Sequence, residues 1–209
     1  MQETAKKTKL THEQYFALEE KSETRHEYYR GNIFDLAGGS VNHNRIIRNF
    51  THFTFDKLRE SSCEVFATEL KVFIESADLF TYPDVLVICG EPQFYKKRDD
   101  TILNPVLIAE VLSESTKNYD RGEKFFFYRQ IPSLRHYILI DQYSPHVEYF
   151  RLGEDGHWVL SEFSRLNDRL QISAPDLNLS LRELYLNIVF EKKEKATDST
   201  TNSIGNQGR

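Results

Sequence analysis

Two stretches of this chain are apolar on both sides of a strand, and they constrain the fold more than any other feature. They are residues 82–89 (YPDVLVIC) and 105–112 (PVLIAEVL). Continuous apolar runs of this length are typical of central strands in a sheet that helices cover. Asp84 and Glu110 interrupt the two runs, and a buried carboxylate is costly unless it is paired, hydrogen-bonded or bound to a metal ion. The two acids are therefore candidates for a functional site.

Local patterns predict further helices and hairpins around these strands. Thr11 and Gln14 form a capping-box pattern that predicts a short helix through about residue 20. Ser40, followed by apolar residues at helical spacing, predicts an amphipathic helix over 41–59. The other predicted elements are a hairpin about Gly31–Asn32, a strand over 63–75, a polar connection over 91–104, a helix over 117–131, a strand over 134–141, a hairpin about Gly153–Gly156 and a final helix over about 180–189. The fold class is α/β (α+β) with a predominantly β middle.

The chain reads as one domain. Its 209 residues are enough to bury a sizeable core. Residues 1–9 are polar and predict a flexible N-terminus, and residues 191–209 are almost free of apolar side chains and predict a disordered tail. The sequence between these two ends contains no linker-like segment and no internal repeat, so we expect a single domain over 10–190.

Composition limits the classes of protein that this chain can belong to. With 27 basic and 32 acidic residues the net charge is −5, which argues against a uniformly basic nucleic-acid coat protein but leaves room for a local basic patch. The start of the chain lacks the apolar region of a secretory signal, and no apolar run approaches the roughly 20 residues of a transmembrane helix. Cys63 and Cys89 stand alone and are expected to be small buried thiols in a reducing compartment. We therefore expect a cytoplasmic protein without membrane contact.

A third acid adds to the candidate site. Glu69 lies on the polar face of the predicted strand over 63–75. If the three strands are neighbours, Glu69, Asp84 and Glu110 converge, and oxygen ligands of this kind suit Mg²⁺. The alternative is that these acids end strands, cap turns or pair with arginines.

Basic residues follow the second acidic strand. Lys117, Arg121 and Lys124 are spaced by four and three residues, so a helix would place them on one face. Such a face beside a metal ion would suit a phosphate backbone. The alternative is an ordinary solvated helix surface.

Several motifs, in this order, resemble those of one family. They are THEQYFALEE, EYYRGNI, AGGSVNHNRI, YPDVLV, PVLIAEVLSEST followed by YDRGEKF, and PSLRHYILID. Together they resemble the restriction-endonuclease-like family, many of whose members are catalogued only as a domain of unknown function, within the PD-(D/E)XK nuclease superfamily. The resemblance covers roughly residues 10–188.

The resemblance implies a restriction-endonuclease-like core, a mixed β-sheet flanked by helices, here with an additional N-terminal helix-hairpin and a C-terminal β-hairpin. It implies that Asp84 and Glu110 hold Mg²⁺, for which Mn²⁺ can substitute, and that a lysine assists the attacking water. The E-x-K pattern would place that lysine at 112, where this chain has Leu112. Lys124, which matches a family lysine on the following helix, is the first candidate, and Lys71 is the second.

Other motif residues receive supporting roles. His43 and Glu27 match family motifs and are either substrate-facing or structural. Asp120 is expected to orient the helix that carries Lys124, and Lys117 and Arg121 are expected to bind substrate.

The predicted function is metal-dependent hydrolysis of phosphodiester bonds in nucleic acid, with DNA as the expected substrate and a homodimer as the expected state. The alternative is a catalytically inactive nuclease-fold module that binds nucleic acid or a protein partner, and Leu112 favours it. Other hydrolases lack their signatures here: the sequence has no H-E-x-x-H, no phosphate-binding G-x-x-x-x-G-K and no G-x-S-x-G. One Trp in the chain leaves little for a sugar-binding site.

Overall fold

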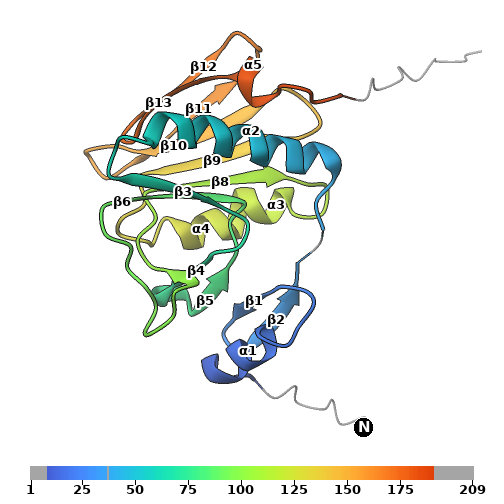
Figure 1. The fold of residues 1–209 in the computed structure, drawn as a ribbon, viewed down its shortest axis with the longest axis vertical. Helices are drawn as coiled ribbons and strands as arrows, with labels where there is room; N and C mark the ends of the chain where they lie inside the picture. The colour runs from blue at the N-terminus through green and yellow to red at the C-terminus, as the bar shows by residue number, and fades with distance from the viewer. Residues whose placement is uncertain (1–8, 37, 191–209) are drawn as a thin grey trace, which may run out of the picture.

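A six-stranded mixed sheet forms the centre of the computed structural model (Figure 1), which describes residues 9–36 and 38–190. Its strand order is β11-β10-β9-β8-β6-β3, in which β8 and β9 are parallel and the other neighbours antiparallel. The apolar runs form β6 and β8, two adjacent inner strands, as predicted. The strand bounds are β3 (Cys63–Ala67), β6 (Val85–Cys89), β8 (Leu107–Leu112), β9 (His136–Asp141), β10 (Val147–Leu152) and β11 (Trp158–Phe163).

Helices cover both faces of this sheet (Figure 1). Helix α2 (Val41–Leu58) packs through Ile46, Ile47 and Phe50 on one face, together with a hairpin and a short helix. A helical segment packs through Phe125 and Tyr128 on the other face. The hairpin is β12 (Arg169–Ser173) and β13 (Asp176–Ser180), the short helix is α5 (Leu181–Leu184), and the segment consists of α3 (Lys117–Tyr119), the π-helical turn η2 (Asp120–Lys124) and α4 (Phe125–Tyr128).

A second, five-stranded sheet of order β2-β1-β5-β4-β7 carries the N-terminal part of the chain. Helix α1 (His12–Glu19), with the predicted capping box at Thr11, packs Tyr15 and Phe16 against it. This arrangement is the expected N-terminal helix-hairpin. Its elements are β1 (His26–Tyr29), β2 (Asn32–Asp35), β4 (Lys71–Ile74), the 3₁₀ turn η1 (Glu75–Ala77), β5 (Leu79–Thr81) and β7 (Thr101–Ile102).

Three predicted elements are corrected by the structure. The strand predicted over 63–75 is two strands in different sheets, β3 and β4, because Thr68 adopts a left-handed conformation (φ 61°) that ends the extended backbone. The first hairpin turns at Arg30 and Gly31, both at positive φ, so Asn32 already belongs to β2. The final helix is only the four residues of α5.

Two other regions were predicted without their strands. The polar connection over 91–104 contains β7, which pairs with β4. The β12–β13 hairpin was missed, although Leu170 and Ile172 alternate with polar residues as its buried side. The predicted N-terminal residues 1–8 and the tail over 191–209 lie outside the described residues.

The cysteines differ from their prediction. Cys63 on β3 and Cys89 on β6 are opposite each other in the ladder and form a disulfide, and both are partly exposed. The expectation of two buried thiols is therefore wrong, and the cysteines lend no support to a reducing compartment. Within the described ranges, none of the helices has the length and apolar character needed to cross a bilayer.

Candidate functional site

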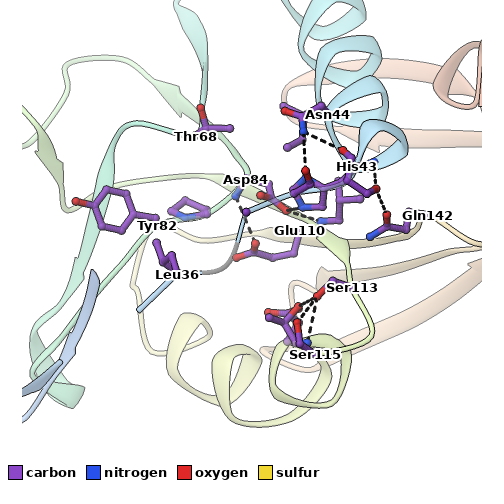
Figure 2. A pocket seen from close by; sticks show the side chains of 18 of the residues that line it. Leu36, His43, Asn44, Thr68, Tyr82, Asp84, Glu110, Ser113, Ser115 and Gln142 are labelled. Atoms are coloured by element: carbon purple, nitrogen blue, oxygen red, sulfur yellow. Dashed lines mark hydrogen bonds and ion pairs between the residues drawn. The ribbon is translucent and has the colours of Figure 1, made fainter. Parts of the chain in front are cut away.

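A cleft of about 710 Å³ opens beside the start of β6 and the middle of β8. Asp84 directly precedes β6, and Glu110 lies within β8. Figure 2 shows both acids and His43 of α2 facing one another in this cleft. The two strands that the sequence marked as central therefore bring the two predicted acids to one place.

Strand register joins the two acids. Val85 pairs with Ala109 in the antiparallel ladder, which places Asp84 opposite Glu110. The backbone N–H of Val111 donates to Asp84 Oδ2 at 2.7 Å, and the Asp84 N–H donates to Glu110 Oε2 at 3.3 Å. Each carboxylate is thus held by the strand that carries the other.

Lys124 reaches this pair from the facing helical segment. Its Nζ lies 2.9 Å from Glu110 Oε1, 3.6 Å from Glu27 Oε1 and 3.7 Å from Asp120 Oδ1. Tyr128 OH donates to the same Glu110 oxygen at 2.9 Å. Lys124 is only 5% exposed, so it is a buried cation among three buried acids.

The π-helical turn η2 directs Lys124 inward. Asp120 and Lys124 begin and end this turn and are both buried. Lys117 and Arg121 are partly exposed and pair with Glu114 at 2.7 Å and Glu148 at 2.6 Å. The predicted common face of Lys117, Arg121 and Lys124 is therefore wrong, because the wider turn changes the helical register.

Burial governs the protonation of this cluster. Burial raises the pKa of Glu110 to about 8; the charges of Asp84 and Asp120 add to this rise, while Lys124 opposes it. Burial alone would lower the pKa of Lys124, but Glu110, Tyr128, Glu27 and Asp120 outweigh it and hold that pKa well above its ordinary value. Burial also raises the pKa of Asp120. Lys124 therefore stays charged, and Glu110 lies near the point where it exchanges a proton at neutral pH.

Glu27 joins the cluster from the second sheet. It lies on β1, buried, where it accepts hydrogen bonds from Thr81 Oγ1 and, at 3.4 Å, from Tyr119 OH. The N-terminal hairpin thereby contributes a counter-charge to Lys124.

Two predicted site residues lie elsewhere. Glu69 follows the break at Thr68, and its 70% exposed side chain pairs with Arg25 at 2.5 Å. Lys71 is buried on β4 and pairs with Asp100 Oδ2 at 2.7 Å. Neither lines the cleft, because the chain leaves the six-stranded sheet at Thr68.

His43 lines the cleft, and two polar residues beside it were missed. Its Nε2 is 3.2 Å from Asp84 Oδ2. Ser40 was predicted only as a helix cap, and Gln142, which is buried at the end of β9, was not singled out. A lone glutamine carries no sequence signal, so only the fold could reveal it.

The carboxylates of the cleft fit a Mg²⁺ site that is open to water and substrate. Across the part of the chain that the structure describes, no group of three or more His, Cys, Asp or Glu side chains is placed to hold a metal ion. Asp84 and Glu110 instead offer two carboxylates in an open cleft, and Mg²⁺ commonly keeps water and substrate phosphate as its remaining ligands.

The six-stranded mixed sheet flanked by helices is a restriction-endonuclease-like fold, and its cleft holds two acids close to a lysine. The chain belongs to the Uma2 family, described as "Putative restriction endonuclease", whose model matches residues 12–182.

Two proteins with similar sequences and one with a similar structure are known. The chain is 37% identical over 164 residues to "Uncharacterized protein sll1609" of Synechocystis sp. strain PCC 6803, covering 78% of this chain and 93% of that protein. It is 34% identical over 182 residues to "Uncharacterized protein slr1290" of the same organism, covering 87% and 94%. A crystal structure described as a "putative nuclease belonging to DUF820", from Anabaena variabilis, has the same fold, with a TM-score of 0.70 at 17% identity over 84% of this chain and 97% of that chain.

Proposed function

We propose that this chain is a metal-dependent endonuclease that hydrolyses phosphodiester bonds in DNA. Family membership supports a nuclease, and the cleft supports the chemistry. Asp84 and Glu110 would hold Mg²⁺, which when bound supplies charge neutralisation at the scissile phosphate and a more acidic water. Lys124 would place a fixed positive charge where negative charge develops on the phosphate.

One observation carries the proposal: Lys124 Nζ lies 2.9 Å from Glu110 Oε1 although position 112 holds leucine. Leu112 is buried in the core that Tyr128 also joins, on the side of β8 that the helical segment covers. A lysine entering from that segment would supply the positive charge that an E-x-K lysine supplies. Leu112 therefore does not by itself argue for an inactive module.

Cleavage of plasmid and single-stranded DNA with Mg²⁺ or Mn²⁺ tests the proposal. Asp84→Asn and Glu110→Gln should abolish cleavage, because each removes a charged ligand while keeping the side-chain shape. Glu69→Gln is the control, since the Glu69 side chain does not line the cleft and is 70% exposed, and this variant should cleave like wild type. Cleavage that survives both Asp84→Asn and Glu110→Gln would refute the assignment.

Calorimetry with Mn²⁺ separates this proposal from the binding-module alternative. A nuclease must bind the ion at Asp84 and Glu110, whereas a binding module need not. We further expect a homodimer, because cutting both strands of a duplex requires two sites. We also expect a cytoplasmic location. Sedimentation of the full chain tests the first expectation, and cell fractionation tests the second.

A further inference from the structure

A ring of polar contacts connects the end of β8 to the start of α2 and returns to β8. Gln142 Nε2 donates to Leu112 O at 2.7 Å, and Ser40 Oγ donates to Gln142 Oε1. The same Ser40 oxygen accepts from the N–H of His43 at 3.1 Å. The ring closes through the His43–Asp84 contact of 3.2 Å and the Val111 N–H that binds Asp84.

The chemistry of this ring fixes the orientation of each member. Leu112 O only accepts, so the NH₂ of Gln142 must face it, which turns Oε1 toward Ser40. A hydroxyl can donate once while accepting elsewhere, so Ser40 serves Gln142 and the first turn of α2 together. Figure 2 shows Gln142 beside the start of α2, next to His43.

Gln142 is 3% exposed, whereas Ser40 lies at the exposed rim of the cleft. This buried amide bonds to a carbonyl at the end of β8 and to the side chain that caps α2, so it links the two elements directly. We propose that Gln142 is a positioning residue of the nuclease site: it holds α2 so that His43 keeps the Asp84 carboxylate in place. This proposal rests on the proposed function for its effect on metal binding, but its structural part stands apart from activity.

Hydrogen exchange of the Val111 amide tests the structural part without any metal. The Val111 N–H bonds to Asp84 Oδ2, so its protection reports on that carboxylate. Gln142→Leu removes both amide contacts at similar volume and should speed exchange of Val111 by about tenfold or more relative to the amides of β9 and β10. Unchanged protection of Val111 would overturn the proposal.

Two further variants keep the test decisive. Ser40→Gly removes the hydroxyl while a glycine cap costs the helix only a few tenths of a kcal/mol, so it should fold and show the same local loss. Ser40→Thr keeps the hydroxyl and should restore protection. Gln130→Leu is the matched control, because Gln130 also accepts from a serine hydroxyl (Ser76) and donates to a backbone carbonyl (Phe126), away from the cleft.

Calorimetry on the same full-length variants then measures their affinity for Mn²⁺. Gln142→Leu and Ser40→Gly should weaken Mn²⁺ binding by about 10- to 100-fold, the range typical of residues that orient a metal ligand. Ser40→Thr and Gln130→Leu should bind like wild type. If wild type binds no Mn²⁺, the proposed function fails while the exchange result still decides the role of Gln142. If exchange and affinity are both unchanged in Gln142→Leu, the positioning role is refuted and the nuclease proposal is untouched.

Discussion

Lys124 Nζ lies 2.9 Å from Glu110 Oε1, so the cation of the site comes from the helical segment and the anion from the strand that it covers. Glu27 and Asp120 lie 3.6 and 3.7 Å from the same Nζ, so buried acids compensate the charge of this buried lysine. The lysine of this site therefore comes from position 124 of the sequence and not from position 112, where the E-x-K pattern would place it.

The two candidate lysines can be separated by matched substitutions. Lys124→Met should lower kcat by about 10²- to 10³-fold, because it removes a fixed charge at the reacting phosphate. Lys71→Met should leave kcat unchanged, since Lys71 pairs with Asp100 outside the cleft and Asp100 keeps Arg98 at 2.7 Å. Urea unfolding of both variants checks that they fold. The opposite order of effects would assign the role to Lys71.

Gly39 gives a second, steric test of the site. A Cβ built on Gly39 would lie 2.6 Å from His43 Nδ1, whereas one on Gly38 meets nothing within 4 Å. Gly39→Ala should therefore displace the His43 ring from Asp84 and weaken Mn²⁺ binding, measured by calorimetry, while Gly38→Ala serves as the matched control. Equal Mn²⁺ affinity in the two variants would show that the His43 ring position does not matter to the site.

The acids of this site were predictable because their signal is local. A carboxylate inside an apolar run is visible in the sequence, and neighbouring strands β6 and β8 then bring Asp84 and Glu110 together. The caps at Thr11 and Ser40 were predictable for the same reason, since a cap depends on residues within one turn.

The positions of the other predicted site residues depend on tertiary contacts, which the periodic spacing of residues in the sequence does not encode. At Thr68 the backbone is left-handed and the chain passes to the second sheet, so Glu69 and Lys71 lie away from the acid pair. The π-helical turn buries Lys124 and leaves Arg121 partly exposed, although helical spacing places them on one face. In both places a single backbone irregularity, stabilised by tertiary packing, decides which side chains reach the cleft.

Metal affinity should depend on pH through Glu110. Its pKa is raised to about 8, chiefly by burial, and only the ionised carboxylate ligates a cation. Mg²⁺ affinity should therefore increase about tenfold per pH unit below about pH 8 and level off above it, with one proton released per ion bound at low pH. Calorimetry in two buffers of different ionisation enthalpy measures that proton release. An affinity that stays constant across this range would contradict the burial argument for Glu110.

The free energy of unfolding should depend on pH through His136, independently of metal binding. His136 is buried, its Nε2 donates to Ala174 O at 2.7 Å and its Nδ1 accepts from Tyr149 OH at 2.8 Å, so the folded ring is neutral. Burial lowers its pKa to about 4, although the Ala174 carbonyl opposes this. The unfolded chain binds a proton near pH 6.5, so the stabilisation is fully present above that pH and is lost as pH falls toward about 4, with ~2 kcal/mol lost between about pH 7 and pH 5.

Urea unfolding at these two pH values checks the His136 effect. His136→Gln cannot titrate, so it should lose less free energy of unfolding than wild type between the two pH values, even though it starts from a lower stability. His157→Gln, at an exposed position of the hairpin loop, should keep the wild-type loss. If His136→Gln shows the same pH slope as wild type, the neutral buried imidazole is not the source of the acid sensitivity.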